Sequence, residues 1–277
     1  MPTINPTEIP VAKMHGLLLD AVIPRPIAFA STINKLGDIN LSPFSFFNVF
    51  SANPPILIFS PSRRGRDKTT KHTLENVLDV PEVVINIVSY EIVHQTSLAS
   101  AEYPRGVNEF NKSKLTEVKS EMVKPPRVGE SPVSFECKVN QVIPLGEGGA
   151  AGNLVLCEVL LMHIQDSIWN ENGRIDPHKL DAVARLGQDY YVRVQGENIF
   201  TVPKPGDKPK IGIDELPLVI RDSRVFTNRD LAILANIEKL PFIDEPESLK
   251  NELRHAMAKE CLERGDTEGA WKILLTG

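Results

Sequence analysis

The chain has 277 residues, of which 42% are hydrophobic and 24% are charged, as expected for a globular protein with a substantial core. The formal net charge is −5, so we expect neither nucleic acid nor an anionic membrane to be the main partner. Cationic residues are concentrated only between Arg63 and Lys71. A cluster of that length has the size of a ligand site and is too small for a nucleic-acid-binding face.

The cysteines and the start of the chain bear on metal binding and compartment. Cys137, Cys157 and Cys261 lie far apart and form no Cys-x-x-Cys pair, so the sequence predicts no metal site. Their odd number favours a reducing compartment, and we expect a cytoplasmic protein. No basic stretch followed by an apolar run opens the chain, so no signal peptide is expected. The apolar stretch 17–30 is interrupted and is shorter than the roughly 20 residues that cross a bilayer, so we expect no membrane span.

Period-two apolar patterns and short apolar runs predict a protein made mainly of strands. Strands are predicted over 26–33, 39–46, 55–60, 83–88, 133–140, 153–165 and 188–195. Short helices are predicted over 73–78 and 92–98, and a further one closing at 183–186. We expect a tight connection at 51–55, because two prolines exclude helix there, and a long surface excursion over 102–129. Strands without regular intervening helices favour a small closed or split barrel over a doubly wound parallel sheet.

The composition changes beyond residue 200. The stretch 203–209 is a linker by composition, and Thr227 to Asp230 resembles a capping box that opens an apolar helix. Two more helices are expected. One begins at Asp244 and carries Leu249, Leu253, Met257 and Cys261 on one face, and the other holds Trp271 and Leu274. We therefore expect a barrel domain over 1–200, and a linker with a helical extension over 201–277 that packs on the barrel or on a dimer partner.

The stretch 40–48 combines three aromatic residues with serine and asparagine, which is unusual for a plain core strand. Flat apolar faces beside small hydrogen-bonding groups suit a planar heteroaromatic ligand. The stretch 63–73, which follows the next strand, is rich in cations and hydroxyls. It is either a solvated loop before a helix or a phosphate site made of cations, hydroxyls and a helix N-terminus. Its position after the aromatic stretch favours the phosphate site.

Other motifs are less informative. The glycine-rich stretch 146–152 is followed by a strand, so we interpret it as a hairpin connection and not as a dinucleotide-binding turn. His72 lies beside the expected phosphate site and could lend charge there. His163 ends a strand, a position more typical of a structural residue. No spacing typical of a metal site or of a serine hydrolase is present in the sequence.

Four blocks, 24–32, 40–48, 53–55 and 71–77, occur in an order that resembles the flavin reductase-like family, of the flavoredoxin type. The resemblance extends from about Val22 to Tyr191. It implies an FMN-binding split β-barrel with short helices, usually a homodimer, with FMN held between barrel strands near the subunit interface. Where the family often has Lys-Asp-Thr, this chain has Lys71-His72-Thr73.

The resemblance also implies which residues contact FMN. Those expected at the isoalloxazine ring are Ser45, Phe46, Phe47 and Asn48, with Ser31 and Thr32 close by. Those expected at the ribityl chain and phosphate are Ser60, Arg63, Lys71 and Thr73, and Thr69 and Thr70 are candidates to share that role. His163 is expected to approach the ring or the incoming nicotinamide.

By the same resemblance, we expect an FMN-dependent oxidoreductase. The expected activity is that of an NAD(P)H:flavin or flavoprotein reductase, with NADH or NADPH as co-substrate. Hydride or electrons would pass through N5 of FMN. The excursion 102–129 is expected to cover the nicotinamide side. An alternative is a flavin-binding electron-transfer or storage protein without NAD(P)H activity, since no motif for the nicotinamide is visible. An interaction protein whose barrel has lost its flavin is a further alternative. Pyridoxamine-phosphate oxidase-like chemistry is disfavoured by the better match to the flavoredoxin-type blocks.

Overall fold

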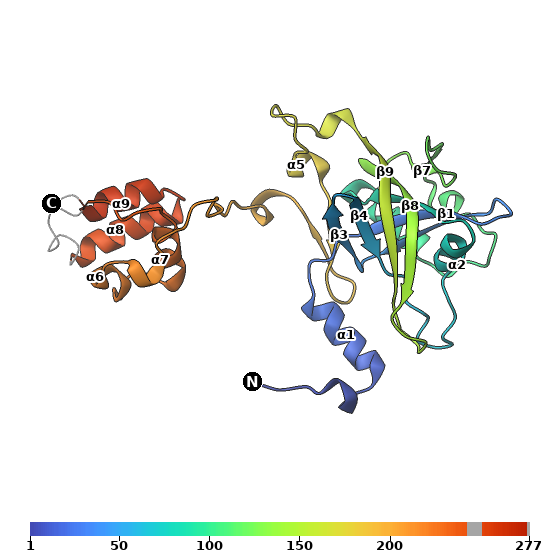
Figure 1. The fold of residues 1–277 in the computed structure, drawn as a ribbon, viewed down its shortest axis with the longest axis horizontal. Coiled ribbons are helices and arrows are strands. Elements are labelled where there is room, and N and C mark those ends of the chain that lie inside the picture. Colours follow the sequence, from blue (N-terminus) through green and yellow to red (C-terminus); the bar gives the residue numbers. More distant parts are fainter. Residues whose placement is uncertain (243–250, 276–277) are drawn as a thin grey trace. The chain divides into compact units, whose positions relative to one another are not determined.

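A computed structural model describes residues 1–242 and 251–275 (Figure 1). The chain forms two compact units, Met1–Phe200 and Thr201–Gly277. The first unit contains a seven-stranded antiparallel sheet in the order β2-β1-β5-β8-β9-β4-β3, together with two small two-stranded sheets, β6-β7 and β10-β11. The strands of the large sheet are β1 (Ala28–Ile33), β2 (Ile39–Phe44), β3 (Phe47–Ala52), β4 (Pro55–Phe59), β5 (Glu82–Ile87), β8 (Val133–Pro144) and β9 (Asn153–Ile164).

The connection between β2 and β3 shows why the large sheet is a barrel. Only Ser45 and Phe46 separate these strands in the chain, yet the strands occupy opposite edges of the sheet. Three Cα steps span at most roughly 11 Å. In a flat sheet, seven strands spaced about 4.8 Å apart would hold their edges roughly 29 Å from each other. The sheet must therefore curl until its edges approach, which gives a barrel that is split between β2 and β3.

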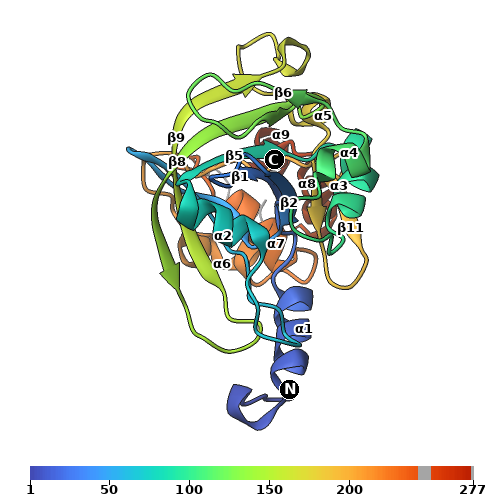
Figure 2. The same ribbon diagram turned by 90° about the vertical axis from the view of Figure 1, so that its right-hand side faces the viewer.

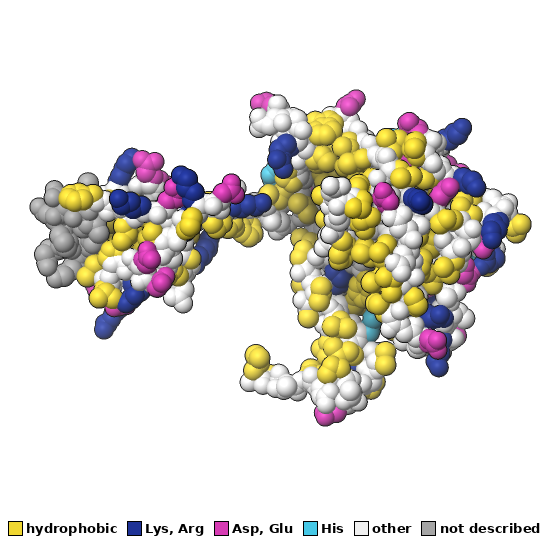
Figure 3. All heavy atoms as spheres, viewed as in Figure 1, with side chains coloured by type: hydrophobic (Ala, Val, Ile, Leu, Met, Phe, Trp, Pro, Cys, Tyr) yellow, Lys and Arg dark blue, Asp and Glu magenta, His cyan; other side chains and the backbone are white. Residues whose placement is uncertain are grey.

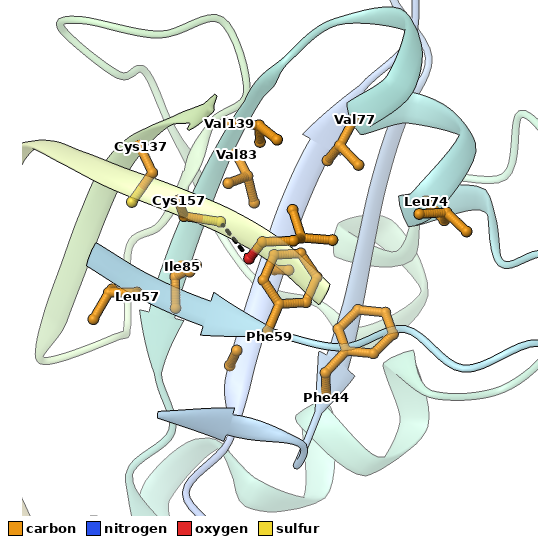
Figure 4. Close-up of a cluster of buried hydrophobic side chains, with 13 residues drawn as sticks. Phe44, Leu57, Phe59, Leu74, Val77, Val83, Ile85, Cys137, Val139 and Cys157 are labelled. Carbon is orange, nitrogen blue, oxygen red and sulfur yellow. Dashed lines mark hydrogen bonds between the residues drawn. The ribbon is translucent and has the colours of Figure 1, made fainter. Parts of the chain in front are cut away.

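The inside of the barrel is filled by aliphatic and aromatic side chains from most of its strands (Figure 4). Phe44 and Phe59 contact each other there, with ring centroids 5.3 Å apart. Cys137 and Cys157 are also buried in this core, and burial raises the pKa of the Cys137 thiol to about 12. Both cysteines are therefore small core residues and not reactive thiols.

Helices and short strands cover the rest of the barrel. A second core lies on the other face of β1, where Phe29 packs against Ile92, Val93 and Phe110. The helices of this unit are α1 (Val11–Ala21), α2 (His72–Asp79), α3 (Val93–Ala99), α4 (Glu109–Ser113) and α5 (Pro177–Leu180). The short strands are β6 (Glu117–Val118), β7 (Arg127–Val128), β10 (Val183–Arg185) and β11 (Tyr191–Arg193).

Two predictions for the first unit need correction, since the tight connection is present but shorter than predicted and one predicted helix end is wrong. Residues 51 and 52 end strand β3, and the tight turn is confined to Asn53 and Pro54 because Pro55 already begins β4. Val183 to Leu186 does not close a helix. The helix α5 ends at Leu180, Asp181 takes a left-handed backbone conformation, and Val183 begins strand β10.

The second unit is a small helical domain with its own apolar core. Its helices are α6 (Leu218–Arg221), α7 (Asn228–Leu234), α8 (Glu252–Glu263) and α9 (Thr267–Leu275). The capping box predicted at Thr227 is present: its side chain accepts from the backbone of Asp230, whose carboxylate accepts from the backbone of Thr227. Trp271 and Leu274 are buried on α9, as expected for a packed final helix.

The expected apolar face of α8 is only partly correct. Leu253 and Met257 are exposed, and the buried face instead carries His255, Ala258 and Leu262 together with Cys261. Small Ala258 allows close helix packing, and α8 makes its most extensive contacts with α9. The predicted helix start at Asp244 and its residue Leu249 lie outside the described residues.

Candidate functional site

A pocket of about 790 Å³ lies between α1, the β2–β3 connection and the loop that joins β4 to α2. In Figure 2 this loop runs beside α1. The volume is within the usual range for a small-molecule or cofactor site, about 300–1,000 Å³. Its lining residues are Val11, Ala12, His15, Leu19, Pro43, Phe44, Ser45, Phe46, Ser60, Ser62, Arg63, Arg64, Gly65, Arg66, Lys71, Glu102, Gly149 and Ala150.

The apolar wall of the pocket is formed at the split of the barrel. The backbone N–H of Ser60 donates to the carbonyl oxygen of Phe46 at 2.8 Å, which fixes the β2–β3 connection against the end of β4. The ring of Phe46 is about one-third exposed and has His15 at its edge, with ring centroids 6.3 Å apart. A partly exposed aromatic ring inside a pocket is available to a planar ligand.

Helix α1 is held over the pocket by a buried arginine. The Arg25 guanidinium donates to the carbonyl oxygens of Leu19 and Val22 at the end of α1, and to that of Leu186. Its Nε also donates to Ser45 Oγ at 3.3 Å. Arg25 thus links the end of α1 to the β2–β3 connection, and both of these segments line the pocket.

The glycine-rich stretch 146–152 is the hairpin between β8 and β9, as the sequence predicts, and it supports the cationic loop. Arg63 N–H donates to the carbonyl oxygen of Ala151 at 2.8 Å, and Ala150 N–H donates to that of Arg63 at 3.1 Å. A Cβ on Gly149 would lie 2.8 Å from the backbone oxygen of Gly65. Only glycine allows the two backbones to approach this closely.

Four cations border the pocket, and they differ in how far they are already paired. Arg64 Nε lies 3.1 Å from Glu102 Oε1, and Arg66 also pairs with the carboxylate of Glu102. Arg63 Nε is buried without a hydrogen-bond partner among the described residues. The Lys71 ammonium makes no hydrogen bond within the described part of the chain, and burial lowers its pKa, with a further lowering by nearby Arg64. Arg63 and Lys71 are therefore the cations available to an anionic ligand.

His72 follows Lys71 but adds little charge to the site. Burial lowers the pKa of its imidazole, and the nearby cations Arg105, Arg64 and Lys71 lower it further. The side chain borders a small polar cavity next to the main pocket, whose lining also includes Asn40 and Thr73. The neutral form of His72 is favoured, so Lys71 carries the positive charge at the start of α2.

Of the residues expected at FMN, Ser45, Phe46, Ser60, Arg63 and Lys71 line the pocket. Thr73 is instead buried, and its Oγ1 donates to Asn40 Oδ1 at 2.6 Å. Thr32 accepts from Asn76 Nδ2 at 3.1 Å, which packs α2 onto β1. Ser31 is buried in β1 and does not border the pocket.

The other residues expected to contact FMN also have their partners within the protein. Thr69 Oγ1 donates to Asp67 at 2.6 Å, and Thr70 Oγ1 donates to Glu75 at 2.5 Å, so both hydroxyls brace the cationic loop. Phe47 packs against the barrel core. Asn48 is exposed on β3, where its side chain accepts from the backbone of Val49.

His163 lies near the end of β9, and it does not border the pocket. Its Nε2 is 2.7 Å from Oε1 of the fully buried Glu136. Glu136 also accepts from the backbone N–H groups of Glu121, Met122 and Val123. Histidine and glutamate together anchor the surface excursion to the sheet.

Comparison with known proteins identifies the family. A family model described as a flavin reductase like domain matches residues 20–174, which is more than half of the chain. The chain belongs to the flavin reductase-like family. A protein from Aquifex aeolicus is 42% identical over 184 residues, covering 66% of this chain and 91% of that protein. YwrF from Bacillus subtilis is 32% identical over 202 residues, covering 72% of this chain and 96% of that protein.

Solved structures with the same fold include flavin-related oxidoreductases. Nitrilotriacetate monooxygenase component B from Bacillus cereus has a TM-score of 0.68 and 32% identity, and the match covers 73% of this chain and 98% of that one. Flavoredoxin from Desulfovibrio vulgaris (Miyazaki F) has a TM-score of 0.56 and 21% identity, covering 67% and 94%. The flavoredoxin match supports the fold alone. These proteins are matched almost in full, while at least a quarter of this flavin reductase-like chain extends beyond each match.

Sequence reasoning missed several residues of this flavin reductase-like pocket. Val11, His15 and Leu19 form one face of α1 at a spacing of four, which is a helical signal that precedes the first strand. Glu102 had no local signal, because it comes to the pocket from the segment after α3. No described helix is both long and apolar enough to span a membrane. Within residues 1–242 and 251–275, no group of side chains could hold a metal ion.

Proposed function

We propose that this chain binds FMN in the pocket and acts as an NAD(P)H-dependent flavin or flavoprotein reductase. The observation that carries the proposal is that one pocket combines the partly exposed Phe46 ring with Arg63 and Lys71, two cations that form no ion pair with a described carboxylate. An aromatic wall suits the flavin ring, and the cations suit its phosphate. Membership of the flavin reductase-like family supports the same ligand.

The residues present fit a phosphate monoester. A buried guanidinium nitrogen without a partner is costly unless a ligand supplies an acceptor, and Arg63 Nε is such a group. Lys71 directly precedes α2, and the partial positive charge of a helix N-terminus adds to that of the ammonium. Two cationic side chains match the charge of a phosphate dianion.

FMN, when bound, would supply hydride and single-electron transfer. The chain's own residues have the simpler tasks of binding and orienting the ligand. Phe46 and the apolar face of α1 exclude water from the ring, while Arg63 and Lys71 hold the anionic end. His15 lies at the edge of the Phe46 ring, and in the proposed complex it would lie beside the flavin ring. No acid or base is required for hydride transfer itself, so the absence of His163 from the pocket does not weaken the proposal.

The purified protein tests this function directly. We expect the visible absorption bands of oxidised flavin in the full-length chain, and bleaching of these bands when NADH or NADPH is mixed with it anaerobically. A protein that binds flavin but is not bleached by either nucleotide would instead be an electron-transfer or storage protein. A protein that binds no flavin, even after incubation with FMN, would contradict both functions.

We also propose that the first unit forms a homodimer. Large apolar side chains are exposed on the edge strand β3, at Val49 and Phe50, and on β9, at Leu160 and Met162. Figure 3 shows hydrophobic side chains gathered on this surface of the first unit. Exposed apolar patches of this kind commonly mark a protein interface.

The Phe50→Asp variant tests the dimer. Phe50 is 64% exposed and lies at an irregularity of the β3–β4 pairing, so its replacement should not disturb the core. A charge placed in an apolar interface is costly, and we expect the mass measured by light scattering after gel filtration to fall from dimer to monomer. Leu36→Asp, at an exposed turn residue elsewhere on the same unit, is the control and should leave the mass unchanged. A Phe50→Asp protein that remains a dimer would contradict this interface.

A further inference from the structure

We propose that Glu102 makes the pocket selective for a flavin that carries one phosphate over one that carries a diphosphate, that is, for FMN over FAD. The inference rests on the proposed binding of a flavin. Glu102 reaches the pocket from the segment after α3, more than 35 residues along the chain from the arginines that it binds.

The charges at the pocket divide into two groups. Arg64 and Arg66 both pair with the single carboxylate of Glu102, and all three side chains border the pocket. Arg63 and Lys71 form no ion pair with a described carboxylate, although Glu102 lies near enough to Lys71 to oppose part of the lowering of its pKa. Arg63 and Lys71 together can neutralise one phosphate monoester. Arginine uses the same N–H groups to bind a carboxylate or a phosphate. Arg64 and Arg66 could therefore bind a second phosphate only if their ion pairs with Glu102 were broken.

Glu102 also opposes a second phosphate directly. A carboxylate held against both arginines would face any anion that approached them, and like charges at such distances repel. FMN has a single phosphate, which Arg63 and Lys71 could hold while Glu102 keeps its pairs with Arg64 and Arg66. FAD carries a second phosphate next to the first, and the pocket cations that would be left for it are Arg64 and Arg66, which already pair with Glu102. The carboxylate therefore penalises the diphosphate more than the monophosphate.

The loop that carries the arginines does not depend on Glu102 for its shape. Arg64 also donates to Thr69 Oγ1 at 3.0 Å and to the carbonyl oxygen of Thr70. The backbone of Arg63 is fixed to the β8–β9 hairpin by two hydrogen bonds with Ala150 and Ala151. Removing the charge of Glu102 should therefore free the two guanidinium groups while leaving the loop in place.

The test is the ratio of flavin affinities in Glu102→Gln. The full-length chain, freed of flavin, is titrated with FMN, FAD and riboflavin, and binding is followed by the quenching of flavin fluorescence. We expect the affinity for FAD relative to FMN to rise by about two- to fivefold, as is typical of one partly exposed charge interaction. The affinity for riboflavin, which has no phosphate, should stay unchanged.

Asp67→Asn is the matched control. Asp67 also pairs with Arg66, at 3.4 Å, but it does not border the pocket, so its removal should leave the FAD to FMN ratio unchanged. If Glu102→Gln raised both affinities equally, Glu102 would merely compete with any phosphate, and the selectivity proposal would be overturned. An unchanged ratio with unchanged affinities would also overturn it. Failure of the unsubstituted chain to bind FMN would instead refute the proposed function.

Discussion

Replacing Glu136 with alanine is expected to lower the free energy of unfolding of the first unit by about 3–5 kcal/mol, the cost of breaking a buried charged hydrogen-bond network. The Glu136 side chain is fully buried on β8, and it accepts from three consecutive backbone N–H groups of residues 121 to 123 as well as from His163. Without the carboxylate these donors lose their acceptor inside the protein, and each unmet buried group is costly. The surface excursion should detach from the sheet.

Urea unfolding, followed by the fluorescence of Trp169, measures this loss in the first unit. The chain has two tryptophans, and Trp271 lies in the second unit, so a Trp271→Phe background isolates the signal. Glu82→Ala is the control. Glu82 accepts from a single backbone N–H, that of Lys124, on the surface, and we expect its loss to cost at most about 1 kcal/mol. Equal effects of the two substitutions would contradict the anchoring role of Glu136.

The same carboxylate makes stability depend on pH. Burial alone would raise the pKa of Glu136, but hydrogen bonds from the backbone of Glu121 and Met122 and from His163 outweigh it, so the pKa is lowered. A lowered carboxyl pKa stabilises the folded state above the ordinary pKa of glutamate, and this stabilisation is lost as pH falls through the folded-state value. The Glu136→Gln variant has no carboxylate at this position, so it lacks this pH-dependent stabilisation. The difference in the free energy of unfolding between the variant and the unsubstituted chain should therefore shrink as the pH is lowered.

Replacing Lys71 with alanine is expected to weaken FMN binding by about 1.5–3 kcal/mol, which is roughly 10- to 150-fold. The Lys71 ammonium is partly buried, makes no hydrogen bond to the described residues and borders the pocket, so a phosphate would be its partner. Riboflavin lacks the phosphate and should bind the variant as well as it binds the unsubstituted chain. Parallel titrations with FMN and riboflavin measure the difference.

Lys68→Ala is the control for this second substitution. Lys68 belongs to the same loop and carries the same charge, but it is exposed and does not border the pocket. Its loss should change FMN affinity by less than about 1 kcal/mol. If Lys71→Ala weakened riboflavin and FMN to the same extent, Lys71 would act on the shape of the pocket and the phosphate would be held elsewhere.

Local patterns in the sequence were sufficient to predict most of the fold. Alternating and continuous apolar runs located the strands of the barrel, because each strand buries one or both faces. The capping box at Thr227 located a helix start, since its hydrogen bonds join residues only three apart. Strand β3 was missed, because the predicted strand 39–46 ran past the end of β2 and the two prolines after β3 suggested that the connection began earlier.

The composition of the site could likewise be predicted, but not the direction of each side chain. The sequence by itself determined that an aromatic stretch and a cationic loop follow one another, and Phe46, Arg63 and Lys71, which the family resemblance singled out within them, line one pocket. Only the tertiary structure decided that Thr73 turns inward to Asn40, that His163 binds Glu136, and that α1 and Glu102 complete the pocket. These contacts join residues that are distant in the chain. They depend on how the sheet curls, which no local pattern of residues records.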